Sequence, residues 1–169
     1  MTVEEFNALD DNAAAVELTA ICGATLWGRL MLARRPFASP EAIRSAAAES
    51  WQALGPGDWL DAVTHHPRIG SGEAAHPTSA RAQSWSSGEQ AGARAASEAS
   101  RRQFAGLSAQ YERMFGRPFI ICATGMSLDD MGAALERRLA HDPDTELGAT
   151  ADELRRITLL RVDKLVAHT

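Results

Sequence analysis

The sequence predicts an all-α protein: a single-domain helical bundle of about seven or eight helices, with a short extended segment near 118–124. Apolar residues recur at helical spacing along almost the whole chain, and no long alternating pattern typical of a strand occurs. Capping residues, prolines and glycines interrupt that pattern at intervals that suit helices. A chain of 169 residues can bury one hydrophobic core, and no internal repeat divides it, so we expect one domain over 1–169.

Start and stop signals define the first helices. Thr2 and Glu5 have the spacing of a capping box, so a short helix is expected to begin there. A long helix is expected over 12–34, with Gly23 as its weak point, and Arg35-Pro36 ends it.

The next two helices are bounded by prolines. Ser39-Pro40 places a capping serine before a proline at the first helical position, and this helix is expected to run to about Leu54. After the turn Gly55-Pro56-Gly57, Asp58 is expected to open a short helix. His66-Pro67 limits that helix, because a proline disfavours helical backbone in the residue before it.

The middle of the chain combines a loop with a long helix. Residues 70–85 are rich in Gly, Ser and Ala and are expected to form a loop, which at this length is often functional. A helix is expected from about Ser87 to Phe115, and Gly116 has the position of its C-terminal stop.

The last third begins with an apolar stretch. Residues 118–123 are apolar and include the β-branched pair Ile120-Ile121, which predicts a buried, extended segment. Ser127 then caps a helix with Asp130 in the capping-box position, and a final helix is expected over roughly 144–166.

Composition excludes several classes of function. The formal net charge of -5 disfavours a nucleic-acid partner that needs a basic face. No apolar run approaches the roughly 20 residues of a membrane helix, so no membrane association is expected. The acidic N-terminus lacks a signal-peptide pattern, and two cysteines, Cys22 and Cys122, are too few for a disulfide framework. The cytoplasm is therefore the expected compartment.

The first candidate for chemistry is His66, in the run His65-His66-Pro67-Arg68-Ile69-Gly70. An imidazole exchanges protons near neutral pH, so a histidine fixed at a helix end can serve as a general acid or base. The alternative is a capped helix end with two exposed histidines.

The second candidate is the run Ser86-Ser87-Gly88-Glu89-Gln90. A helix N-terminus presents free N–H groups that can bind an anion or a urea-like group. Glu89 can accept hydrogen bonds from ligand N–H groups, and the amide of Gln90 can pair with a planar polar ligand. The alternative is a capping box with a purely structural role.

The third candidate is Arg161, which lies within the apolar face of the last helix. It follows Ile157 by four residues and Leu154 by seven, and it precedes Leu165 by four. Burying an unpaired guanidinium costs several kcal/mol. Arg161 is therefore expected to clamp a carboxylate substrate, to form a structural salt bridge, or to extend to water.

Other chemistries have weaker support. His65, His66 and His76, with Glu73 or Glu89, could supply metal ligands, but no histidine pair at i, i+4 occurs and we expect no metal. No Gly-x-Ser-x-Gly elbow is present, and Cys122 has apolar neighbours that do not activate a thiol.

Several motifs, taken together, resemble those of the OHCU decarboxylases, which act on 2-oxo-4-hydroxy-4-carboxy-5-ureidoimidazoline in urate breakdown. The resemblance covers nearly the whole chain. The residues that carry it are Trp27, Arg35-Pro36-Phe37, His66-Pro67-Arg68-Ile69-Gly70, Ser86, Glu89-Gln90, Tyr111, Phe115-Gly116, Pro118-Phe119-Ile120-Ile121-Cys122-Ala123, Arg137-Arg138-Leu139, Glu146-Leu147, Ile157 and Leu160-Arg161.

The resemblance implies an all-helical, cofactor-free carboxy-lyase, a homodimer, that forms (S)-allantoin and CO2 from a small ureidoimidazoline. It implies His66, Glu89 and Arg161 as catalytic residues. It departs from the family at Thr124, where many relatives carry a basic residue. The substrate contacts that it implies are Pro67, Ser86, Ser87, Gly88, Glu89, Gln90, Phe119, Ile120, Ile121, Cys122 and Ala123.

The substrate's own ring explains why no cofactor is expected. The carboxylate lies beside a ring C=N bond that can accept the electron pair left when CO2 departs. His66 is the expected proton-transfer group. A helical binding module without chemistry and a metal-dependent hydrolase are the competing classes, distinguished by alanine substitution at His66 or Glu89 and by sensitivity to chelators.

Overall fold

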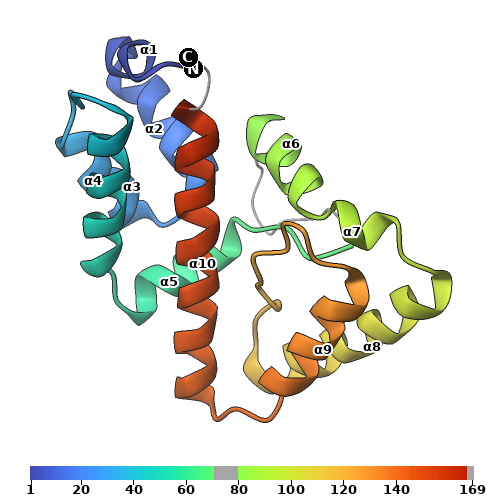
Figure 1. Cartoon of the computed structure of the whole chain (residues 1–169). Coiled ribbons are helices and arrows are strands. Elements are labelled where there is room, and N and C mark those ends of the chain that lie inside the picture. Colours follow the sequence, from blue (N-terminus) through green and yellow to red (C-terminus); the bar gives the residue numbers. More distant parts are fainter. Residues whose placement is uncertain (71–79, 167–169) are drawn as a thin grey trace. The chain divides into compact units, whose positions relative to one another are not determined.

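A computed structural model describes residues 1–70 and 80–166 (Figure 1). These residues form ten α-helices and no strand, which confirms the all-α class and exceeds the seven or eight helices expected. None of the described helices is long and apolar enough to cross a membrane. The chain divides into two compact units, Met1–His65 with the segment from Leu154, and His66–Glu153.

The first unit contains five complete helices and the C-terminal part of a sixth. α3 packs against α2, α4 and α5. From Leu154 onward α10 belongs to this unit. The helices are α1 (Val3–Ala8), α2 (Asp11–Ile21), α3 (Thr25–Ala33), α4 (Pro40–Gln52), α5 (Pro56–Thr64) and α10 (Pro143–Val166).

Capping signals place the helix starts of the first unit. Thr2 and Glu5 form the expected capping box at α1. The Ser39 hydroxyl accepts a hydrogen bond from the backbone of Ala42, as expected for α4. Asp58 differs from the expectation: α5 begins earlier, at Pro56, and the Asp58 carboxylate accepts a hydrogen bond from the N–H of Gly55 at 2.9 Å.

The single helix expected over 12–34 is two helices, α2 and α3. The break lies at Gly23, whose φ of +82° belongs to the left-handed region that favours glycine. A Cβ built at Gly23 would lie 2.5 Å from the Cβ of His65. The break therefore depends both on backbone conformation and on the close approach of His65.

The core of the first unit is apolar and aromatic. Trp27 is completely buried, and its indole N–H donates to the carbonyl of Ala47 at 3.1 Å. Phe6 stacks on Phe37 with ring centroids 6.2 Å apart. Other fully buried side chains of this unit include Leu18, Ile21, Met31, Ile43, Leu154, Val162 and Leu165.

The second unit contains four helices, the N-terminal part of α10, and a stretch without helix or strand over 118–123. α8 and α9 lie side by side in this unit (Figure 1). An extended segment is expected near 118–124; residues 118–123 lie outside any helix, and Phe119, Ile120 and Ala123 are buried as expected. The helices are α6 (Ala80–Glu89), α7 (Ala91–Arg94), α8 (Glu98–Phe115) and α9 (Leu128–Arg138).

The long helix expected from Ser87 to Phe115 was wrong. α6 begins at Ala80, inside the stretch expected to be a loop, and α8 has its own N-cap, Ser97, whose hydroxyl accepts from the N–H of Ser100 at 3.1 Å. The rest of the expected loop, 71–79, lies outside the described residues. Gly116 ends α8 in the left-handed conformation, as expected.

Aromatic side chains from α8 and the irregular stretch form the core of the second unit. Phe119 makes edge contacts with Phe104 and Tyr111, with centroid distances of 6.4 and 5.3 Å. Met131 and Leu135 of α9 complete this cluster and are fully buried. α9 begins with the expected capping box of Ser127 and Asp130.

Candidate active site

His66 is the first residue of the second unit and is 5% exposed. α5 ends at Thr64, and His65 caps it, in agreement with the limit expected from Pro67. The alternative of two exposed histidines therefore does not hold for His66. Its imidazole is shielded from bulk water, as a proton-transfer group in a closed site would be.

The run 86–90 lies at the end of a helix, which corrects the capping-box interpretation. Because α6 begins at Ala80, its free N–H groups are at the other end, and the N–H of Gln90 donates to the carbonyl of Ser86 at 3.0 Å. Ser86 and Glu89 are three residues apart and both buried, so they share the inner face of α6. Ser87 and Gly88 are exposed. This run therefore ends a helix rather than beginning one, and Glu89 is its buried carboxyl group.

A hydrogen bond joins the end of α6 to the run that begins at His66. The side-chain oxygen of Gln90 accepts from the backbone N–H of Gly70 at 3.1 Å. The structure therefore brings together two runs that are 20 residues apart in the sequence.

A cavity of about 480 Å³ in the second unit connects the same region to the irregular stretch. Arg68 and Ile69 line it together with Phe119, which was expected to contact substrate. Its wall is mostly apolar. The lining also includes Gly70, Ala93, Arg101, Phe104, Ala105, Ser108, Ala109, Glu112, Pro118 and Leu128.

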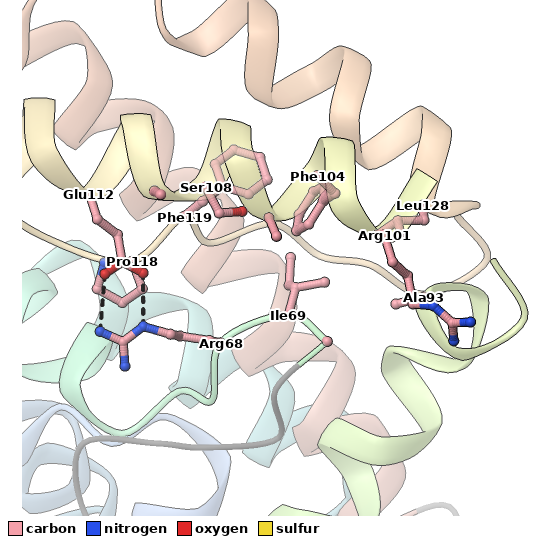
Figure 2. Close-up of a pocket in the computed structure, with 13 residues that line it drawn as sticks. Arg68, Ile69, Ala93, Arg101, Phe104, Ser108, Glu112, Pro118, Phe119 and Leu128 are labelled. Carbon is pink, nitrogen blue, oxygen red and sulfur yellow. Dashed lines mark hydrogen bonds and ion pairs between the residues drawn. The ribbon is translucent and has the colours of Figure 1, made fainter. Parts of the chain in front are cut away.

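Charged side chains lie at both ends of this cavity (Figure 2). At one end Arg68 forms a bidentate ion pair with Glu112. Its Nε donates to Oε1 at 2.8 Å and its Nη2 donates to Oε2 at 3.1 Å. Figure 2 shows Arg101 beside Ala93 and Leu128 at the other end. The sequence interpretation assigned no role to Arg68 or Glu112, because residues 44 apart give no pairing signal.

The segment Phe119–Ala123 uses several backbone groups within the chain. The carbonyl of Ile120 accepts from Arg138, and the N–H of Cys122 donates to the carboxylate of Glu153 at 2.9 Å. The carbonyl of Ala123 accepts from Met126 at 3.0 Å. The resemblance implies substrate contacts along this segment, and these three backbone groups already form hydrogen bonds within the chain.

A buried ionic cluster in the second unit was also missed. Arg138 pairs with Glu146, which is 0% exposed. Arg138 follows Met131 by seven residues and Ala134 by four, so it lies on the apolar face of α9. The same spacing drew attention to Arg161, and it is the signal that would have found this cluster.

Arg161 belongs to the first unit and is 3% exposed, as its place on the apolar face predicts. Its Nη1 donates to the carbonyl of Ala20 at 3.1 Å. Nearby, burial raises the pKa of the Cys22 thiol to about 11, so this cysteine stays protonated at neutral pH.

No group of three or more His, Cys, Asp or Glu side chains suited to a metal ion occurs within residues 1–70 and 80–166. Two of the ligands considered from the sequence, Glu73 and His76, lie outside the described residues.

The chain is similar to proteins of urate degradation. A sequence model of the family described as OHCU decarboxylase matches residues 7–163. The 2-oxo-4-hydroxy-4-carboxy-5-ureidoimidazoline decarboxylase of Haloferax volcanii is 29% identical over 165 residues, which cover 96% of this chain and 94% of that protein. The uric acid degradation bifunctional protein TTL of Arabidopsis thaliana is 35% identical over 150 residues, 88% of this chain. The chain spans only 46% of that plant protein.

A solved structure has the same fold. The crystal structure of an OHCU decarboxylase in the presence of (S)-allantoin matches with a TM-score of 0.73 and 28% sequence identity. The match covers 90% of this chain and 98% of that chain.

Proposed function

Because the chain belongs to the OHCU decarboxylase family, we propose that it converts 2-oxo-4-hydroxy-4-carboxy-5-ureidoimidazoline to (S)-allantoin and CO2 without a cofactor. The observation that carries the proposal is the buried imidazole of His66 in a run hydrogen-bonded to the end of α6, where Glu89 is buried. The proposed acid/base group, His66, and the proposed binding carboxyl group, Glu89, thus come from two separate runs of the sequence.

The reaction needs little from the protein beyond orientation and proton transfer. The bond between the ring carbon and the carboxylate breaks, its electron pair moves toward the adjacent C=N bond as CO2 leaves, and the nitrogen of that bond takes up a proton. The carbon that carries the ureido group then takes a proton on one face, while the hydroxyl group gives one up. His66 performs this proton transfer as a general acid/base.

Glu89 is the second catalytic residue of the proposal. Its carboxylate accepts hydrogen bonds from the N–H groups of the ureide and so fixes the face of the ring that receives the proton. Ser86 shares the buried face of α6 and adds a hydroxyl group. The remaining contacts come from Pro67, Ser87, Gly88, Gln90 and the segment Phe119–Ala123.

Arg161 is the third catalytic residue of the proposal. Its role is to supply positive charge for the polar oxygens of the substrate. We expect Arg161→Gln to lower kcat/KM. Arg44→Gln is the control, because Arg44 is a half-exposed arginine of the same unit that pairs with Asp163 at 2.7 Å.

Assembly and compartment complete the proposal. We expect a homodimer that works in the cytoplasm, as the resemblance to the family implies. Light scattering on the purified chain gives the mass in solution, and a monomer would remove the dimer from the proposal.

The stereochemistry of the product tests His66. The substrate decays spontaneously to racemic allantoin, so circular dichroism of product formed from urate, urate oxidase and hydroxyisourate hydrolase isolates the catalysed route. We expect His66→Asn to lower kcat/KM by about 10²–10⁴-fold. A variant that still forms one enantiomer at the parental rate would show that His66 is not the proton-transfer group.

The neighbouring histidine supplies a matched control. His65 is partly exposed, and its Nδ1 lies 3.1 Å from the hydroxyl of Thr64. His65→Asn keeps the Cβ that packs at Gly23. We expect it to retain the parental rate and enantiomer.

A further inference from the structure

Arg138 stands at the C-terminal end of α9 and is only 8% exposed. A guanidinium has five N–H donors in a fixed plane, so it can hold several acceptors in one geometry. Nε donates to both oxygens of Glu146 at 2.9 and 3.1 Å, and Nη2 donates to the hydroxyl of Thr150 at 2.9 Å. Nη1 turns the other way and donates to the carbonyl of Ile120 at 2.6 Å.

Glu146 anchors this arginine. Its carboxylate is completely buried and also accepts from the hydroxyl of Tyr111 and from Nδ1 of His141, the latter at 2.9 Å. Burial by itself would raise the pKa of Glu146, but the hydrogen bonds from Arg138 and Tyr111 outweigh it, and the pKa lies below its ordinary value. The Thr150 hydroxyl also donates to Glu146, at 3.4 Å, so this anion accepts hydrogen bonds from four side chains. A buried network with its groups satisfied is rigid.

The other end of Arg138 holds the segment Phe119–Ala123. The guanidinium lies over the ring of Phe119, 4.7 Å from its centroid, in addition to the bond to the Ile120 carbonyl. Residues 118–123 have neither helix nor strand, so no helical or sheet ladder fixes their backbone. Two side chains supply that order: Arg138 donates to the carbonyl of Ile120, and the carboxylate of Glu153 accepts from the N–H of Cys122.

We propose that Arg138, anchored by Glu146, is a positioning residue that sets the conformation of Phe119–Ala123 for substrate binding. The inference rests on the proposed function, in which this segment contacts the substrate. Arg138 itself acts through Phe119 and Ile120. Displacing a binding group by about 1 Å can cost on the order of 10²-fold in rate.

Arg138→Lys tests the proposal, because lysine keeps the charge but cannot reach Glu146, Thr150 and Ile120 at once. Since the segment binds the ring both before and during the reaction, its displacement raises KM more than it lowers kcat. We expect KM to rise about tenfold or more. Arg137→Lys is the matched control, because Arg137 is the preceding residue of α9 and is exposed. We expect its KM to equal the parental value.

The alkylation rate of Cys122 reports on the conformation of Phe119–Ala123 and does not require an activity measurement. Cys122 is half-buried in this segment, and its N–H is held by Glu153. Cys22 is buried and its pKa is raised, so it should react slowly at pH 8. Alkylation at this pH followed by peptide mapping therefore measures the reaction rate of Cys122. We expect alkylation of Cys122 to be faster in Arg138→Lys and unchanged in Arg137→Lys.

The outcomes separate the two proposals. A folded Arg138→Lys protein with parental KM and parental Cys122 alkylation overturns the positioning role. Faster alkylation with a parental KM also overturns it, because the segment then moves without consequence for substrate. If the parental chain forms no (S)-allantoin, the proposed function fails, whatever Arg138 does to Cys122.

If circular dichroism shows that Arg138→Lys does not fold, Tyr111→Phe tests the positioning role of Arg138 instead. It removes one hydrogen bond to Glu146 and keeps the ring in the core. We expect a KM about two- to fivefold above the parental value, because the anchor of Arg138 is weakened but present. A parental KM in this variant would overturn the proposal.

Discussion

The two units of the chain bury different kinds of side chain. The first unit fills its core with apolar and aromatic groups, and Arg161 is its buried charged residue within the described part of the chain. The second unit buries Glu89, Arg138 and Glu146 together with the imidazole of His66. Removing ionised groups from water costs several kcal/mol each. Burying these groups in the second unit costs folding free energy, and in return their positions are fixed. Such local costs are typical of functional sites.

The units also satisfy their buried polar groups differently. In the first unit, Trp27 and Arg161 donate to the backbone carbonyls of Ala47 and Ala20, and the Ser50 hydroxyl contacts the sulfur of Met31. In the second, Glu146 accepts hydrogen bonds from four other side chains, those of Tyr111, Arg138, His141 and Thr150. The second unit therefore contains a network whose members depend on one another, and damage to one member should spread further there than in the first unit.

The largest difference is expected on removing one buried polar side chain from each unit. Glu146→Ala leaves Arg138 buried without its anion, which we expect to lower the free energy of unfolding by about 3–5 kcal/mol. Ser50 is equally buried in the first unit, but its hydroxyl contacts only the sulfur of Met31, at 3.6 Å. Ser50→Ala should cost less than about 1 kcal/mol. Urea unfolding measures both, and a cost for Ser50→Ala equal to that of Glu146→Ala would remove the distinction between the units.

A smaller effect is expected at a glycine of the second unit. A Cβ at Gly92 in α7 would lie 2.0 Å from the carbonyl oxygen of Met126, so that backbone must move. We expect Gly92→Ala to cost roughly 1–3 kcal/mol. Gly106 of α8 has open space, and Gly106→Ala should stabilise the protein by up to about 1 kcal/mol. Thermal unfolding compares the two variants, and equal melting temperatures would contradict the close approach of α7 to Met126.

The smallest expected effect is a change in how the free energy of unfolding depends on pH in acid. The pKa of Glu146 lies below its ordinary value of 4.5, so the unfolded chain binds this proton at a higher pH than the folded chain. Its contribution is fully present above about pH 4.5 and is lost as pH falls through the folded-state pKa. Glu146→Gln should therefore flatten the fall in stability below pH 4.5.

Glu41 of the first unit is the control for acid stability. Its pKa is also lowered, first by a hydrogen bond with its own backbone N–H and then by Ser39, but its carboxylate is exposed to solvent. Glu41→Gln should leave the acid profile of urea unfolding close to parental. A parental profile in Glu146→Gln would mean that the buried pair does not govern acid stability.

Local signals made much of the fold predictable. The capping boxes at Thr2 and Ser127 and the stop at Gly116 each involve residues three or four apart, so the sequence displays them directly. The region 80–97 was wrong because Ser86 and Glu89 have capping-box spacing inside a helix that starts earlier. A pattern of two residues cannot tell the start of a helix from its inner face.

The candidate site was predictable only where one residue carries the signal. His66 is a candidate because of its own chemistry, and the structure buries it; its role stays a prediction. The hydrogen bond from Gly70 to Gln90 and the pair of Arg68 with Glu112 join residues 20 and 44 apart, which only the fold brings together. Arg138 stands at the end of a helix, where a basic residue is usually a solvated partner of the helix dipole, so its position alone does not indicate a buried ion pair.

A crystal structure of the chain with (S)-allantoin bound tests the central claim most directly. The account predicts the ureide against the backbone of Phe119–Ala123, with His66 and Glu89 within hydrogen-bond distance of it. Allantoin bound away from His66 and Glu89, with neither side chain in contact, would contradict the account.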